Sequence, residues 1–178
     1  GDAYLNRLKT LGVDTSGVIS RSDCFTAQAF ITTDLQDNQI TAFHPGAMDS
    51  SHLNDVLLAV QQKKSSTNPI RLGIVAPDGR QGMIVHAKQF TEAAIPFIFD
   101  PGQGLPMFDG KELEVFIEQA SYIAVNDYEG EMLAIRTGLS LKTIAQRVQA
   151  LIVTKGSQGA DVYVNGEVVK TIVGAKPK

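Results

Sequence analysis

Short apolar stretches alternate with helix-periodic segments through most of this chain. Apolar runs bounded by turn residues indicate buried strands, and apolar positions three and four residues apart indicate helices. Strands are predicted, about 25 to 30 residues apart, at Ile70–Ala76, Pro96–Asp100, Tyr122–Val125 and Leu151–Thr154. Helices are predicted around them at Leu53–Gln62, Arg80–Ala94, Gly110–Ala120, Tyr128–Arg136 and Leu141–Ala150. This alternation predicts an α/β fold whose mainly parallel sheet carries helices on both faces.

The two ends of the chain have a different pattern. Near the N-terminus a helix is predicted at Ala3–Leu11, ended by Gly12, and strands follow at Thr26–Asp34 and Gln39–Phe43, joined by a turn at Asp37-Asn38. We interpret residues 18–43 as a small antiparallel β lid, and residues 1–17 and 44–178 as the α/β core. Near the C-terminus, Asn165-Gly166 predicts a type I′ hairpin between Ala160–Val164 and Glu167–Val173.

The segment FHPGAM joins the lid to the core. Pro45-Gly46 fits the centre of a type II turn, because glycine tolerates a positive φ. Phe43 and Met48 flank this turn, where they either clamp a flat ligand or pack the junction, and the pattern alone favours packing. Asp49, Ser50 or Ser51 is the expected N-cap of the following helix.

Composition narrows the class of protein. The 178 residues are enough for one domain with a sizeable core, and 43% are hydrophobic and 20% charged. A net charge of −3 without a basic run argues against nucleic-acid binding. Cys24 is the single cysteine, which excludes an internal disulfide. Neither a signal-peptide pattern nor an apolar run of about 20 residues is present, so we expect a cytoplasmic protein without membrane contact.

The stretch SYIAVNDYEGEM carries the strongest candidate chemistry. Ligands of open α/β sheets bind outside the carboxyl ends of the strands, and Asn126 and Glu129 follow such a strand within one helical turn. An amide and a carboxylate there can hold a hydrated Mg²⁺ or orient a phosphate. The alternative is a structural capping box, with Asn126 or Asp127 as N-cap and Glu129 as its partner. The two interpretations are compatible, and spacing alone favours capping.

A glycine loop follows the last parallel strand. In Thr154-Lys155-Gly156-Ser157-Gln158-Gly159 the backbone N–H groups can approach a nucleotide closely. The loop has neither the Walker A nor the Rossmann glycine spacing, and glycine turns between strands are common. The four parallel strands all have polar residues at the same edge of the sheet. These four strand ends together are therefore stronger evidence for a site than the glycine loop alone.

The order of these segments resembles the ribokinase-like (PfkB) family of sugar and nucleoside kinases across essentially the whole chain. VNDYEGEML matches the family's N-x-x-E motif and VTKGSQG its T-x-G-x-x-G loop. The TAQAFITTD…ITAFHPGAM hairpin and the DPGQ loop are most similar to bacterial adenosine kinases of this type.

The resemblance implies ATP- and Mg²⁺-dependent phosphorylation of a primary hydroxyl of a nucleoside or sugar. It assigns Asn126 and Glu129 to Mg²⁺ and the phosphates, with the metal held through water or a phosphate. It places Thr154, Gly156 and Gly159 near ATP, and brings Phe43, Met48 and Gln103 to the acceptor from the lid and the DPGQ loop. A lid of this kind leaves apolar surface and open edges, which pairing in a homodimer would cover.

The resemblance is incomplete at both ends. The family's catalytic Asp lies in a D-[TS]-x-G-A-G-D motif, which does not occur in these 178 residues, so no catalytic residue is assigned and the chain alone is expected to be inactive. The family's first strand, with a substrate-binding Asp and a G-G-x-x-x-N segment, is also missing. An adenosine kinase, a ribokinase-type sugar kinase and a non-catalytic nucleotide-binding fragment remain the alternatives.

Overall fold

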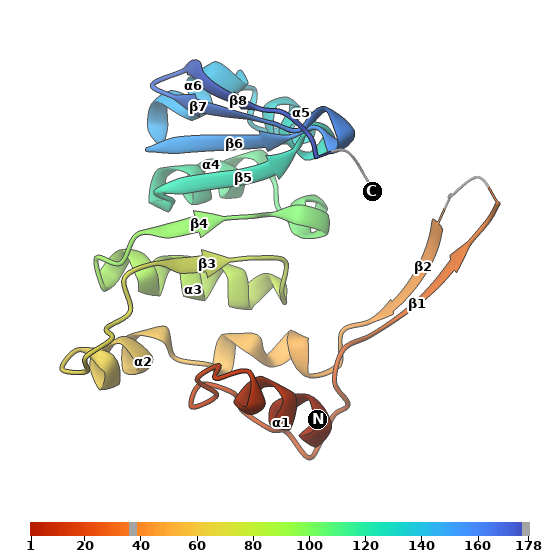
Figure 1. Ribbon diagram of the computed structural model, residues 1–178, viewed down its shortest axis with the longest axis vertical. Helices are drawn as coiled ribbons and strands as arrows, with labels where there is room; N and C mark the ends of the chain where they lie inside the picture. The colour runs from red at the N-terminus through yellow and green to blue at the C-terminus, as the bar shows by residue number, and fades with distance from the viewer. Residues whose placement is uncertain (36–38, 176–178) are drawn as a thin grey trace.

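The computed structural model describes residues 1–35 and 39–175 and contains one main sheet and one projecting arm (Figure 1). The predicted Asp37-Asn38 turn lies outside the described residues. The main sheet has the order β3-β4-β5-β6-β7-β8. Neighbours from β3 to β6 pair in parallel, whereas β7 and β8 pair antiparallel. The strands are β3 (Gly73–Val75), β4 (Phe97–Phe99), β5 (Tyr122–Asn126), β6 (Ala150–Thr154), β7 (Ala160–Val164) and β8 (Glu167–Ile172).

The helices that alternate with these strands pack against one face of the sheet and against one another. They are α3 (Arg80–Glu92), α4 (Gly110–Gln119), α5 (Asp127–Thr137) and α6 (Leu141–Arg147). Among the described residues, Ile74 on the second face of β3 is 62% exposed. An apolar run does not distinguish burial on one face from burial on two, because its outward residues are apolar as well.

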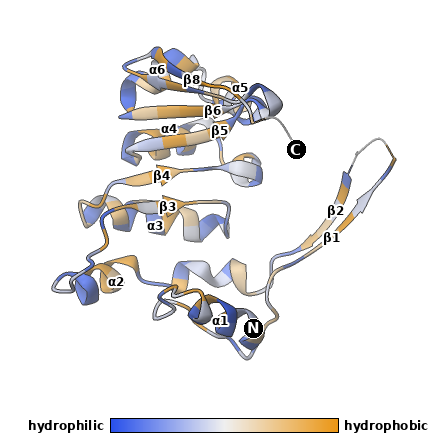
Figure 2. Cartoon of the chain, viewed as in Figure 1, coloured by the Kyte–Doolittle hydropathy of each residue, from blue (hydrophilic) through white to orange (hydrophobic). Residues whose placement is uncertain are grey.

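The core lies between the sheet and these four helices. Alternate strand residues such as Val75, Phe99 and Ile123 point into it and are almost fully buried. Phe99 and Phe116 stack with ring centroids 4.5 Å apart, and Phe108 meets Phe116 edge-on at 5.0 Å. Hydrophobic residues accordingly concentrate in the strands of the main sheet, whereas the helices are mixed (Figure 2). Aromatic burial of this kind makes the sheet a rigid support for the loops at its carboxyl edge.

The arm consists of β1 (Gln28–Thr33) and β2 (Gln39–His44), which pair antiparallel from Gln28↔His44 to Thr33↔Gln39. It projects on the side where the carboxyl ends of β3–β6 lie (Figure 1). The predicted antiparallel lid is therefore present, although residues 18–27 form no strand. The N-terminal helix α1 (Asp2–Thr10) ends before Gly12, which has the expected positive φ of 74°.

The connection from the arm to the core differs from the prediction. Pro45 has ψ −31°, which excludes a type II turn, and Gly46, with φ 52°, begins the 3₁₀ helix η1 (Gly46–Leu53). A methyl group on Gly46 would lie 2.2 Å from the Phe25 carbonyl oxygen, so close backbone contact requires glycine here. The helix α2 (Val56–Lys63) starts later than predicted and is capped by Asp55, because residues 49–51 belong to η1.

The C-terminal hairpin follows its turn residues. Asn165 and Gly166 have φ values of 52° and 83°, as a type I′ turn requires at both central positions. The strands on either side pair with a register irregularity between Val162 and Tyr163. The prediction of a hairpin centred on Asn165-Gly166 is therefore confirmed.

Candidate functional site

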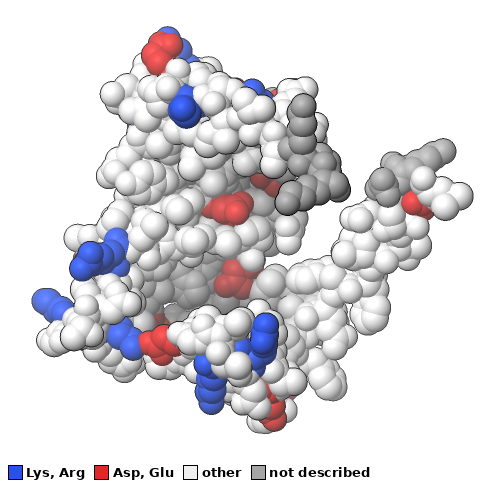
Figure 3. All heavy atoms as spheres, viewed as in Figure 1, with Lys and Arg blue, Asp and Glu red and all other residues white. Residues whose placement is uncertain are grey.

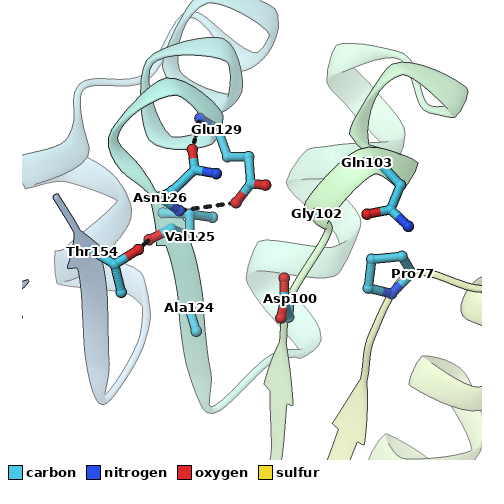
Figure 4. Close-up of a pocket in the computed structure, with 9 residues that line it drawn as sticks. All are labelled: Pro77, Asp100, Gly102, Gln103, Ala124, Val125, Asn126, Glu129 and Thr154. Carbon is cyan, nitrogen blue, oxygen red and sulfur yellow. Dashed lines mark hydrogen bonds between the residues drawn. The ribbon is translucent and has the colours of Figure 1, made fainter. Parts of the chain in front are cut away.

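The carboxyl ends of β3 to β6 surround a pocket of about 470 Å³. Its walls come from strand ends, from the start of α5 and from the 3₁₀ helix η2 (Gly102–Met107) that follows β4 (Figure 4). The lining residues are Pro77, Asp100, Gly102, Gln103, Ala124, Val125, Asn126, Glu129 and Thr154. Most of its polar groups are oxygen donors, which suits a cation or the hydroxyls of a polar ligand.

The junction of β5 and α5 places two of these residues. Asn126 ends the strand with extended backbone (φ −83°, ψ 175°), and its side-chain oxygen accepts a 2.7 Å hydrogen bond from the Glu129 N–H. The Oε2 atom of Glu129 accepts a 2.9 Å hydrogen bond from the Asn126 N–H. The predicted capping box is confirmed, with Asn126 and not Asp127 as the cap. The cap occupies one carboxylate oxygen of Glu129, so Oε1 remains for a ligand.

Asp100 faces Glu129 across this pocket from the end of β4 (Figure 4). Burial, and then the nearby Glu129 carboxylate, raise the pKa of Asp100, although the Gly102 N–H partly opposes this. Two neighbouring carboxylates of this kind attract a cation. The sequence predicts Asn126 and Glu129 at the sheet edge beside the Asp100 loop, but it gives a binding role only to Gln103 of that loop. The position of Asp100 at the end of a strand is the signal that could have added it to the site.

The glycine loop after β6 is next to this pocket but contributes only Thr154 to its lining. The Thr154 hydroxyl donates to the Val125 carbonyl oxygen at 3.5 Å. Gly156 and Gly159 lie outside the pocket, in a turn closed by hydrogen bonds from Lys155 N–H to Gly159 O (2.7 Å) and from Gly159 N–H to Gly156 O (3.0 Å). The pocket therefore unites Asn126, Glu129 and Thr154 but not the two glycines.

A second pocket, of about 580 Å³, lies between the arm and the core. The three residues predicted to bind an acceptor, Phe43, Met48 and Gln103, all line it, together with Ala29, Ile31, Thr41, Pro77, Asp78, Gly104 and Met107. Pro77 and Gln103 line both pockets, so the two cavities adjoin. Acidic side chains line the hollow between arm and sheet, whereas basic side chains lie toward the outside of the molecule in this view (Figure 3).

Neither a ready-made metal-ligand cluster nor a membrane-spanning helix is found in the described part of the chain. No group of three or more His, Cys, Asp and Glu side chains is arranged to hold a metal ion without other ligands. Within the same residues, no helix is both long enough and apolar enough to cross a lipid bilayer. A metal at the carboxylate pair would therefore need ligands from water or substrate.

A family model described as pfkB family carbohydrate kinase matches residues 1–175. The chain belongs to the pfkB family of carbohydrate kinases. Its resemblance to a nucleoside kinase of Methanocaldococcus jannaschii extends over 160 residues at 29% identity and covers 90% of this chain but 50% of the relative. This pfkB chain thus spans about half the length of the curated relatives it matches.

Solved structures confirm the ribokinase-like fold of this pfkB chain. The nucleoside kinase of Burkholderia thailandensis in complex with inosine matches with a TM-score of 0.86 and 48% identity, covering 96% of this chain and 53% of the other. The same enzyme in complex with ADP-inosine matches with a TM-score of 0.86 and 47% identity, over 98% of this chain and 52% of the other. A ribokinase from Thermotoga maritima, 21% identical over 99% of this chain and 57% of its own, shares the fold with a TM-score of 0.71.

Proposed function

We propose that this pfkB chain contributes the acceptor and phosphate sites of an ATP-dependent purine nucleoside kinase, with adenosine as the preferred acceptor. The observation that carries the proposal is the pair of adjoining pockets that share Gln103. One is acidic and lies at the sheet edge, and the other is partly apolar and lies under the arm. A phosphoryl donor and an acceptor hydroxyl must meet in this way for in-line transfer.

The apolar pocket favours a nucleoside over a free sugar. Phe43 and Met48 offer aromatic and thioether surfaces to a flat base, and the Gln103 amide supplies a donor and an acceptor. With ribose as the acceptor, the side chains of Phe43 and Met48 would remain exposed to water. The similarity to a kinase solved with inosine supports a purine nucleoside and makes inosine the natural competitor of adenosine in a test.

The side-chain oxygen atoms in the pocket at the carboxyl edge of the sheet are suitable ligands for Mg²⁺. Asp100, Glu129 and the side-chain amide oxygen of Asn126 supply hard oxygen ligands. Mg²⁺ is usually held by one or two carboxylates plus water and substrate phosphates. When bound, the ion would neutralise charge on the transferring phosphoryl group. The chain's own contribution is to orient the phosphates beside Gln103, while the arm excludes water from the acceptor. In the ATP site we place Thr154, Gly156 and Gly159 beside the nucleotide.

The proposal takes no general base from this chain. The family's G-A-G-D motif does not occur in the 178 residues, and we place Asp100 at the cation site with Glu129. We expect these residues by themselves to bind ligands without useful phosphoryl transfer, and kinetic tests use the full-length protein.

Steady-state kinetics of the full-length protein with adenosine, inosine and ribose test this function. We expect kcat/KM for adenosine to be the highest of the three, and at least about 100-fold above that for ribose, because ribose lacks the base that fills the apolar pocket. A higher kcat/KM for ribose would contradict the nucleoside assignment. Nucleotide binding without any phosphoryl transfer would instead support a non-catalytic module.

The outward face of the arm predicts a homodimer. Phe30 and Ile40 lie on the face of the arm that points away from the pocket between the arm and the core, and they are 67% and 79% exposed. We expect light scattering to give a dimer mass for the wild type and a monomer mass for Phe30→Glu, because a buried charge would oppose lid pairing. Val115→Glu is the matched control, since Val115 is an exposed apolar residue on α4. A monomeric wild type with an ordered arm would count against the dimer.

A further inference from the structure

Met48 and Met107 line the pocket between the arm and the core, here called the acceptor pocket, and they come from separate segments of the chain. The side of the pocket that each methionine lines is called its wall. Met48 belongs to η1, which connects the arm to the core, and Met107 is the last residue of η2. Both segments are short 3₁₀ helices, which have poor hydrogen-bond geometry and little stability of their own. The distance between the walls therefore depends on what holds each segment in place.

Gly79 sets the position of the Met48 wall. It is the N-cap of α3, and a methyl group built on it would lie 2.7 Å from the Met48 carbonyl oxygen and 3.2 Å from the Asp49 Cα. The backbone of Gly79 has φ −54° and ψ 134°, which other residues adopt without strain. The close approach of η1 is thus the reason that a side chain does not fit at this position.

Arg80, the next residue, holds the Met107 wall. Its Nε donates a 3.2 Å hydrogen bond to the Met107 carbonyl oxygen, and its guanidinium lies 5.6 Å from the Phe108 ring centroid. Its Nη2 pairs with Glu112, whose other oxygen accepts a 3.0 Å hydrogen bond from the Asp109 N–H. Arg80 therefore ties the end of η2 to the starts of α3 and α4.

We propose that the dipeptide Gly79-Arg80 fixes the separation of Met48 and Met107 and thereby determines acceptor selectivity. The inference rests on the proposed nucleoside kinase function, and Gly79 and Arg80 are positioning residues, since neither lines the acceptor pocket. Pro77 and Asp78, which do line it, precede them directly. A shift of either wall changes the fit of a flat base, whereas a free sugar does not fill the space between the walls.

Three variants of the full-length protein test this inference. Gly79→Ala pushes the Met48 wall, and we expect KM for adenosine to rise about tenfold with kcat within about twofold. Arg80→Met releases the Met107 wall, and because Arg80 is partly exposed we expect a smaller rise of about threefold to fivefold. Arg80→Lys should preserve thermal stability without restoring KM, because an ammonium group does not reproduce the planar fork.

Selectivity separates positioning from general structural damage. In each variant the ratio of kcat/KM for adenosine to that for ribose should fall by the factor seen in KM, while KM for ATP stays unchanged. Gly17→Ala and Lys88→Met are matched controls, since a methyl group on Gly17 meets no atom within 4 Å and Lys88 lies on the exposed side of α3. Both should behave as wild type.

Calorimetric titration with adenosine, which needs no turnover, distinguishes failure of this inference from failure of the proposed function. A wild type that binds and phosphorylates adenosine, with variants of unchanged KM and Kd, overturns the role of Gly79-Arg80 alone. Parallel increases of KM for adenosine, ribose and ATP would also overturn it. A wild type that binds no nucleoside overturns both the function and the inference.

Discussion

The Glu129→Gln variant of the full-length protein should lose about 100-fold in kcat while keeping its fold. The amide oxygen of glutamine can still accept the hydrogen bond from the Asn126 N–H, so the start of α5 stays capped and Tm should remain within about 2 °C. The lost charge weakens cation binding at the pocket. The Mg²⁺ concentration for half-maximal rate should therefore rise about tenfold or more.

The decrease of Mg²⁺ affinity at low pH provides a second measurement on the same variant. In the wild type, burial and Glu129 raise the pKa of Asp100, so acidification protonates Asp100, and weakens Mg²⁺ binding, at a higher pH than for an ordinary aspartate. Removal of the Glu129 charge lowers the pKa of Asp100, and the loss of binding should move to lower pH. A titration of Mg²⁺ affinity against pH in both proteins measures this shift.

Glu131→Gln is the matched control for the Glu129 variant. Glu131 lies on the same helix, is exposed and lines none of the described pockets at the sheet edge, so the same charge change there should leave Mg²⁺ dependence and kcat as in the wild type. If Glu129→Gln gives a normal Mg²⁺ titration, Glu129 is only a helix cap and the metal assignment is wrong.

Gly159→Ala should destabilise the protein by about 3 kcal/mol or more. Gly159 has φ 94°, and a methyl group on it would lie 1.8 Å from the Ile172 carbonyl oxygen and 2.7 Å from the Gly174 nitrogen. Neither neighbour is a flexible side chain, so the loop and the end of β8 must both move. Chemical denaturation of the variant and the wild type measures the change in the free energy of unfolding.

Gly156→Ala is the stability control within the same loop. Gly156 also has a positive φ, of 54°, but a methyl group on it would meet no atom within 4 Å. The expected loss is therefore only the backbone cost of about 1 kcal/mol. Equal losses at the two positions would show that the contact with β8 does not explain Gly159, and would leave close approach of a nucleotide as the reason for glycine there.

Interactions within a few residues were readable from the sequence. The Asn126 and Glu129 capping box spans one helical turn, and the Asn165-Gly166 turn depends on the φ values of two adjacent residues. Such features depend on local geometry, which the surrounding fold seldom overrides. The same holds for the alternation of strands and helices, since each element carries its own apolar period. The sequence did not predict the start of α2 correctly. The residues expected to cap it belong to η1, and Asp55 is its N-cap instead.

The arrangement of the site depended on contacts between distant segments. Asp100 lies beside Glu129 because β4 and β5 are neighbours in the sheet, and the sequence contains no signal for that order other than the βαβ rule. Met48 and Met107 line the same pocket because η1 and η2 both contact the start of α3. Which residues of each strand point into the core was likewise decided by packing, because the outward residues of these strands are as apolar as the buried ones.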